Sequence, residues 1–257
     1  MHQGGAPAMK DVIRVAAVGD THVPRAGHAG LQPMLAAAAA AADVLVLCGD
    51  ITDYGLPEEA RIVATALQQT VRIPVVAVLG NHDFESGNAD EVKKILVDVG
   101  VIVLDGDAQE VAGIGFAGVK GFAGGFGPRA LAPWGENSIK NFVHEAVNEA
   151  LKLESALARL RTLHRVAVLH YAPILGTVSG EPPEIYPFLG SSRLEDPLNR
   201  YPVSAVFHGH AHRGSLEGRT REGAPVYNVA MPLLVQLFPG QPPVRIIELP
   251  TAMAAVA

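Results

Sequence analysis

The sequence predicts an α/β fold, and three observations lead to this expectation. Short apolar runs rich in β-branched residues alternate with helical segments, and the runs end in polar or glycine-rich clusters. Of the 257 residues, 49% are hydrophobic and 18% are charged, which is enough apolar side chain for a sizeable core. No apolar run reaches the roughly 18 to 20 residues of a membrane span, so we expect no membrane partner.

The first half of the chain is predicted to alternate strands and helices. Continuous apolar runs predict strands over 12–18, 44–47, 75–79 and 101–104. Helical patterns, the first of them rich in alanine, predict helices over 31–42, 57–69 and 89–99. Pro57 and Glu58 suit the first turn of the second helix, and Gly100 ends the third. Residues 109–119 alternate around Gly113 as a β-hairpin does.

The second half begins with a glycine-rich, aromatic loop from Lys120 to Gly135. A long helix is predicted over Glu136 to Leu163, and a short one over Ser192 to Asn199. The remaining strand patterns lie at 166–169, 203–207, 226–229 and 244–249. No repeat or linker is visible, which predicts a flexible N-terminal segment at 1–11, a single domain over 12–250 and a frayed tail at 251–257.

Five predicted strands end in residue types that bind metals. These clusters are Asp20-Thr21-His22, Gly49-Asp50-Ile51-Thr52-Asp53, Gly80-Asn81-His82-Asp83, His170, and Gly209-His210-Ala211-His212. Because the carboxyl ends of strands meet at one edge of an α/β sheet, we expect these clusters to form one site. Carboxylate, imidazole and amide donors without a thiolate suit manganese, iron or zinc. Seven candidate ligands exceed the needs of one catalytic zinc ion, which favours two ions sharing a carboxylate.

The ordered motifs DxH, GDxxD, GNHD, H and GHxH resemble those of the calcineurin-like metallophosphoesterase superfamily. The resemblance runs from Asp20 to His212, about three quarters of the chain. It implies a four-layer α-β-β-α sandwich in which two mixed sheets are flanked by helices. It also implies two transition-metal ions, either divalent or trivalent, held by ligands from all five motifs.

The resemblance assigns a role to each motif residue. One metal ion would be held by Asp20, His22 and His212. The other would be held by Asn81, His170 and His210. The Asp50 carboxylate would bridge the two ions. His82 would protonate the leaving oxygen, and Asp83 would orient the His82 ring, the alternative for Asp83 being a cap of the turn.

The expected function is a metal-dependent phosphohydrolase with a metal-bridging hydroxide as nucleophile. Its expected substrate is a small phosphoester, with a phosphodiester preferred to a monoester. The alternatives are a metallo-nuclease and a non-catalytic scaffold of the same fold. A formal charge of −6 and the lack of a basic stripe with interleaved aromatics argue against nucleic acid. The complete ligand set argues against a scaffold, and the oligomeric state stays open.

Other residues carry lesser expectations. The single cysteine, Cys48, excludes an internal disulfide, fits a reducing cytoplasm, and is predicted to lie in the core. Asp53 is expected to hydrogen-bond a ligand histidine or the turn backbone. His208 is expected to be packed and hydrogen-bonded rather than to face the metals. Two interpretations of the loop from Lys120 to Gly135 stay open. It is a lid over the metal edge, since its glycines allow movement and its aromatic rings offer apolar faces, or it is a surface segment with no part in the site.

Overall fold

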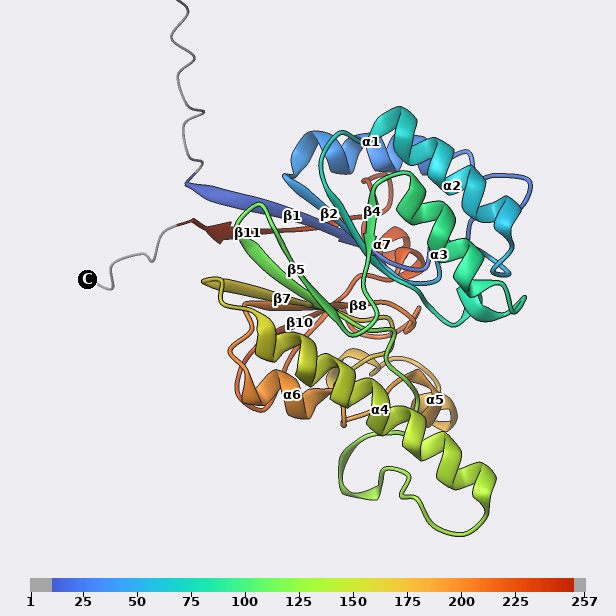
Figure 1. Cartoon of the computed structure of the whole chain (residues 1–257), viewed down its shortest axis with the longest axis vertical. Helices are drawn as coiled ribbons and strands as arrows, with labels where there is room; N and C mark the ends of the chain where they lie inside the picture. The colour runs from blue at the N-terminus through green and yellow to red at the C-terminus, as the bar shows by residue number, and fades with distance from the viewer. Residues whose placement is uncertain (1–10, 252–257) are drawn as a thin grey trace, which may run out of the picture.

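Two mixed β-sheets lie face to face, and helices cover the outer side of each sheet (Figure 1). This computed structural model describes residues 11–251. The predicted flexible segment and frayed tail lie outside the described residues, except for Asp11 and Thr251. The four layers agree with the predicted α-β-β-α sandwich.

The first sheet has five strands in the order β11-β1-β2-β3-β4. These strands are β1 (Val12–Val18), β2 (Val44–Cys48), β3 (Val75–Val78), β4 (Val101–Val103) and β11 (Arg245–Pro250). Strands β1 to β4 are parallel, and β11 pairs with β1 in the antiparallel direction. Its outer face is covered by α1 (Leu31–Ala41), α2 (Pro57–Thr70) and α3 (Ala89–Asp98). The parallel arrangement brings the ends of β1, β2 and β3 to one edge.

The second sheet has six strands in the order β5-β6-β7-β8-β10-β9. They are β5 (Asp107–Val111), β6 (Ile114–Gly118), β7 (His164–Val168), β8 (Ala205–His208), β9 (Glu217–Arg219) and β10 (Pro225–Asn228). Strands β5 and β6 form the predicted hairpin, and β6, β7, β8 and β10 are parallel. The outer face is covered by α4 (Asn137–Arg159) and α6 (Glu195–Arg200).

Apolar side chains fill the space between the sheets and beneath the helices. Alternate residues of β1 and β2 point to opposite faces, so Val46 and Cys48 face the second sheet while Leu45 and Leu47 face the helices. Phe116 and Phe207 are fully buried on the inner face of the second sheet. Strands buried on both faces read as continuous apolar runs, which is why the sequence predicts them well. The predicted core position of Cys48 is confirmed.

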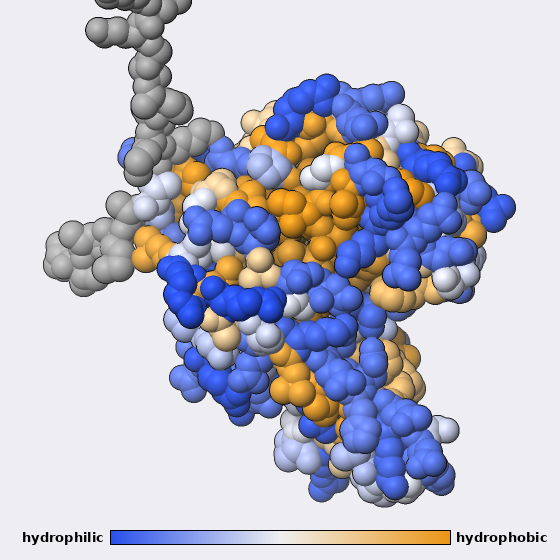
Figure 2. All heavy atoms as spheres, viewed as in Figure 1, coloured by the Kyte–Doolittle hydropathy of each residue, from blue (hydrophilic) through white to orange (hydrophobic). Residues whose placement is uncertain are grey.

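The outer faces of the helices are polar. In α4 the buried residues recur every three or four positions, as a helix with one apolar face requires. Figure 2 shows mostly hydrophilic residues over α2 and α4, with apolar residues gathered near β4. No helix among residues 11–251 is both long enough and apolar enough to cross a membrane.

Among the strands and α-helices, three short elements were not predicted, and helix α4 is shorter than expected. The additions are β9, α5 (Tyr186–Leu189) and α7 (Met231–Leu237). Each has seven residues or fewer, too short for hydrophobic periodicity to reveal it. Helix α4 ends at Arg159 rather than Leu163, because the backbone turns extended at Leu160, whose side chain is buried in the core beside the second sheet.

Candidate metal centre

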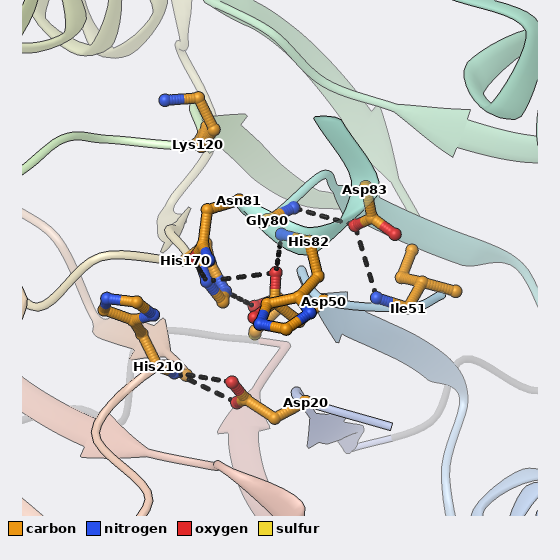
Figure 3. A network of polar contacts seen from close by, with 12 residues as sticks. Asp20, Asp50, Ile51, Gly80, Asn81, His82, Asp83, Lys120, His170 and His210 are labelled. Carbon is orange, nitrogen blue, oxygen red and sulfur yellow. Dashed lines mark hydrogen bonds and ion pairs between the residues drawn. The ribbon is translucent and has the colours of Figure 1, made fainter. Parts of the chain in front are cut away.

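The ends of strands from both sheets converge on one cluster of polar side chains (Figure 3). Asp20, Asp50 and Asn81 follow β1, β2 and β3 of the first sheet. His170 and His210 follow β7 and β8 of the second sheet. The structure therefore brings the five motifs together, although the chain separates Asp20 from His210 by 190 residues.

Potential metal-donor atoms form three overlapping groups in this cluster. The groups are Asp20, His22 and His212; His22, Asp50 and His82; and Asp50, His170 and His210. In each group the donor atoms lie within 4.8 Å of one another. The Asn81 amide oxygen extends the third group, because it lies 2.9 Å from His170 Nε2. Asp50 belongs to two of the groups, one with His22 and His82 and the other with His170 and His210.

The backbone of the cluster adopts a conformation that most residues avoid. Five non-glycine residues between 11 and 251 have a positive φ, and four of them are predicted ligands: Asp20 (57°), His22 (40°), Asp50 (46°) and His210 (68°). Aspartate and histidine tolerate this left-handed region better than most residues, but it remains unfavourable. Such strain persists where the surrounding structure enforces it, as it does at functional sites.

Two glycines allow the ligand loops to approach one another. A Cβ at Gly80 would lie 2.2 Å from the Asp50 backbone nitrogen and from Asp50 Oδ1. A Cβ at Gly209 would lie 2.2 Å from Asp20 Oδ2. Any side chain at either position would push a carboxylate out of place. The glycines of the GNHD and GHxH motifs thus set the spacing of the cluster.

Asp50 and His170 form a buried pair at the centre. Asp50 Oδ1 lies 3.3 Å from His170 Nε2 and accepts a hydrogen bond of 2.8 Å from the His82 backbone N–H. Burial would raise the pKa of Asp50, but the charge of His170 and these donors hold it below its usual range. Burial would lower the pKa of His170, and the Asp50 carboxylate raises it. The two opposite shifts share one cause, because each charge of the pair stabilises the other.

Hydrogen bonds to backbone carbonyls orient the histidine rings. His170 Nδ1 lies 2.9 Å from the Cys48 carbonyl oxygen, which leaves Nε2 free to face Asp50 and Asn81. His210 Nε2 lies 3.2 Å from the Phe188 carbonyl oxygen. Burial, followed by the charge of His170, lowers the pKa of His210 to about 3. A neutral imidazole held by its other nitrogen is the form that binds a metal ion.

The environment of His22 tests whether these residues fit a metal ion. His22 Nε2 is buried, and no hydrogen-bond partner for it lies within the described chain. It lies 3.7 Å from Asp50 Oδ2, and the His22 ring meets the His212 ring edge-on at 5.4 Å between centroids. Burying a polar nitrogen costs free energy unless a hydrogen bond or a metal ion replaces its contact with water. The donor types, their spacing and this unpaired nitrogen all fit a bound transition-metal ion.

His82 lies at the side of the cluster, next to His22. Its ring meets the His22 ring edge-on, with 4.5 Å between centroids. His82 Nδ1 lies 2.7 Å from the Asp53 carbonyl oxygen and 3.7 Å from Glu85 Oε2. Its side chain is about one third exposed, so the ring is open to solvent on one side. The ring is therefore held by one nitrogen and accessible, as an acid for a leaving group must be.

Asp83 is predicted to orient the His82 ring, but the hydrogen bonds of its carboxylate within residues 11–251 go to other groups. Its carboxylate is fully buried and accepts hydrogen bonds from the backbone N–H groups of Ile51, Thr52 and Gly80 and from the Thr52 hydroxyl. Burial and the charge of Asp50 raise its pKa, while these donors lower it. Asp83 thus ties the loop after β3 to the loop after β2, close to the alternative role as a cap of the turn.

Replacing Asp83 by alanine is expected to lower the free energy of unfolding by roughly 2–4 kcal/mol. The change leaves buried N–H and O–H donors without an acceptor, and each such group costs about 1–3 kcal/mol unless water replaces the carboxylate. Denaturant unfolding of the metal-free protein measures the loss. The exposed Asp98, paired with Lys94 on the surface of α3, is the matched control, because Asp98→Ala removes under about 1 kcal/mol. Equal losses in the two variants would contradict the bridging role of Asp83.

The lesser expectations have mixed outcomes. His208 is fully buried and bonded to Thr177 Oγ1 at 2.8 Å, as predicted. The Asp53 carboxylate lies 3.6 Å from His22 Nδ1, and the Asp53 backbone carbonyl accepts a hydrogen bond from His82 Nδ1. The loop from Lys120 to Gly135 starts beside His170, whose N–H bonds to the Lys120 carbonyl, but Trp134 is 69% exposed. The contact of the Phe188 carbonyl with His210 could not be predicted from the sequence, because every residue has a backbone carbonyl.

The chain is similar to one protein family and to several solved structures. Its sequence matches a profile of calcineurin-like phosphoesterases over residues 13–214. A phosphopantetheinyl hydrolase from Mycobacterium tuberculosis has a TM-score of 0.63 and 17% identity, over 91% of this chain and 95% of that one. A candidate 5′-nucleotidase from Staphylococcus aureus has a TM-score of 0.52 and 14% identity, over 84% of this chain and 48% of that one.

A further structure of the same fold comes from Thermus thermophilus, with a TM-score of 0.50 and 14% identity over 94% of this chain and 100% of that one. A search of curated proteins found none that matches the sequence. At these identities the three solved structures establish the fold, and the profile match covers more than three quarters of the chain.

Proposed function

Because the chain belongs to the calcineurin-like phosphoesterase family, we propose that its metal centre holds two ions and hydrolyses a small phosphodiester. Membership of the family makes the chain a metal-dependent phosphoric ester hydrolase. The observation that supports two ions is that Asp50 shares one donor group with His22 and another with His170 and His210. Seven donors from five strand ends exceed what one ion takes from protein.

The two donor groups define the proposed ligands. One ion would be held by Asp20, His22 and His212, whose donor atoms form the first group. The other would be held by Asn81, His170 and His210, with Asp50 between the two ions. Two bound manganese, iron or zinc ions would supply Lewis-acid charge that activates water and offsets the negative charge of the phosphoryl oxygens.

His82 is the proposed general acid. Its Nδ1–H donates to the Asp53 carbonyl, so the proton available to a substrate is the one on Nε2. Donation from Nε2 to the leaving oxygen returns the ring to the neutral tautomer that the carbonyl already favours. Glu85, whose carboxylate lies 3.7 Å from Nδ1, stabilises the charged ring before the proton leaves. The His82 backbone N–H holds Asp50 at the same time.

His82 also belongs to a donor group with His22 and Asp50, which offers a second role for it. In that role the ring would be a metal ligand in place of an acid. The two roles predict different metal contents after substitution, because loss of a ligand releases an ion and loss of an acid does not. Its partial exposure favours the acid, because the proposed ligand His170 is fully buried.

The substrate class is a proposal that the family alone does not decide. The solved relatives include a phosphopantetheinyl hydrolase and a candidate 5′-nucleotidase, both named for small phosphorylated molecules. The net charge of −6 gives no general attraction for nucleic acid. Small phosphoesters are therefore the proposed substrates, with diesters ahead of monoesters as the GNHD motif suggests.

An activity panel tests this proposal. Metal-reconstituted protein is compared on 4-nitrophenyl phosphate, bis-4-nitrophenyl phosphate, cyclic nucleotides and nucleoside diphosphate derivatives. The proposal expects faster turnover of a diester than of the monoester with the same leaving group. Faster turnover of the monoester would overturn the diester preference, and no turnover of any ester would overturn the proposed function.

Adding metal to chelator-treated protein is expected to raise the melting temperature by roughly 8–16 °C. At a free metal concentration about 1,000 times Kd, binding adds about 4 kcal/mol of stability, and each kcal/mol shifts a chain of this size by roughly 2–4 °C. Differential scanning calorimetry measures the shift with manganese, iron and zinc in turn. Absence of a shift with all three would contradict the proposed centre.

A further inference from the structure

Lys120 is fixed beside the metal centre by its backbone. Its carbonyl oxygen accepts hydrogen bonds of 3.0 Å from the N–H groups of both His170 and Tyr171. The residue follows the end of β6, at the same edge as the ligand strands. In Figure 3 it lies beyond Asn81 and His170, on the side of the cluster away from Asp20. The backbone of Lys120 is therefore hydrogen-bonded to the backbone of a proposed ligand, His170.

The ammonium group of Lys120 is held by rings rather than by a carboxylate. Its Nζ lies 4.9 Å from the centroid of Phe122, 5.3 Å from Tyr171 and 5.6 Å from Phe84. Tyr171 follows His170 directly, and Phe84 lies two residues after His82. Two of the three rings thus belong to the loops that carry the proposed ligand and the proposed acid. A cation over aromatic faces is favourable, but such a contact does not use the N–H donors as a hydrogen bond to a carboxylate does.

Most of the hydrogen-bonding capacity of Lys120 is unused. Within the described chain its Nζ donates once, to the Gly121 carbonyl at 2.9 Å, and has no carboxylate within 4.0 Å. An ammonium has three donors. The buried carboxylate of Glu149 is engaged by the Gly121 N–H and by Lys152 Nζ, both at 2.7 Å. Burial lowers the pKa of Lys120, and Glu149 acts in the opposite direction from a distance.

A cavity of about 140 Å³ lies next to this ammonium, lined by Phe84 and Lys120 among others. It is also lined by Lys93 and Lys152, and by the carboxylates of Asp105 and Glu149, both of which pair with Lys152. Asp90 of α3 and Glu145 of α4 complete its charged lining. The cavity thus offers room beside the loop of His82 with a cation whose donors are not consumed by these carboxylates.

We propose that Lys120 binds a second anionic group of the substrate, separated by a short linker from the phosphoester at the metal centre. The inference rests on the proposed function of that centre and narrows its substrates to small phosphoesters that carry a further phosphate or carboxylate. Lys120 is a specificity-determining residue in this account. The two unused N–H donors would bind the anion, and the rings of Phe84 and Tyr171 would contact the linker.

Matched inhibitors test the proposal on the metal-loaded protein. Inhibition of chromogenic ester hydrolysis is compared for 3-phosphonopropionate and propylphosphonate, and for 4-phosphonobutyrate and butylphosphonate. Each pair differs in the terminal carboxylate. The wild type is expected to bind at least one carboxylate inhibitor about tenfold or more tightly than its alkyl partner, as a charge-assisted hydrogen bond allows. No preference in either pair would overturn the proposal without any variant.

Substitution assigns the preference to Lys120. Lys120→Met is expected to bring the ratio within a pair to about one, and Lys120→Arg to keep most of it. Lys140→Met, which removes a lysine of α4 outside the cavity, should keep the full ratio. A preference that survives in Lys120→Met would overturn the assignment. If that variant does not fold, loss of the preference in Lys120→Gln decides the same question.

The outcome is separate from that of the proposed function. If the metal-loaded wild type hydrolyses no ester, this result counts against the metal centre as a phosphoesterase site. Hydrolysis of the chromogenic ester with no carboxylate preference would count against Lys120 alone.

Discussion

Asp50→Ala is expected to remove metal and activity together. The carboxylate lies between the two donor groups and within 4.8 Å of donors in both, so its loss weakens the binding of either ion. Loss of the ions removes the positive charge that stabilises the transition state. That stabilisation amounts to several kcal/mol, so kcat/KM is expected to fall about a thousandfold or more. Elemental analysis and steady-state kinetics on the same preparation measure both losses.

The control for this variant is Asp107→Ala. Asp107 is an exposed carboxylate at the start of β5, far along the chain from the ligand loops. It should keep the metal content and kcat/KM of the wild type. Retention of two ions by Asp50→Ala, with activity lost, would mean that Asp50 acts on substrate and does not join the two sites.

His82→Ala is expected to keep both ions and to lose turnover. General acid catalysis contributes about a hundredfold to ten-thousandfold, and it matters most where the leaving alcohol is a poor leaving group. We therefore expect a large fall in kcat for alkyl esters and a small one for 4-nitrophenyl esters, with little change in KM. The measurement is the ratio of the fall in kcat for alkyl esters to the fall in kcat for 4-nitrophenyl esters.

His144→Ala, in which an exposed histidine of α4 is removed, is the matched control and should leave both substrates unaffected. Loss of an ion from His82→Ala would assign the ring as a ligand through its group with His22 and Asp50. An equal fall for both leaving groups would contradict proton donation to the leaving oxygen.

The sequence predicts the location of the cluster because each motif is local. A glycine and a ligand residue directly follow a continuous apolar run, as in Val75–Val78 followed by Gly80 and Asn81. Parallel strands then bring these ends together without any further signal in the sequence. The family resemblance supplies the grouping of ligands. Donor distances place His22 both with Asp20 and His212 and with Asp50 and His82.

The sequence could not predict contacts that depend on distant segments. Asp83 follows His82, so a role for it on that ring was the natural expectation, yet its hydrogen bonds reach Ile51 and Thr52 across 32 and 31 residues. The rings around Lys120 come from three separate segments in the same way. Neither arrangement leaves a periodic or spaced pattern in the sequence.

The shared site of two ions is tested most directly by anomalous diffraction from crystals of the manganese-loaded protein. The account predicts two peaks roughly 4 Å apart, one beside Asp20, His22 and His212 and the other beside His170, with Asp50 between them. A single peak, or two peaks without Asp50 between them, would contradict it.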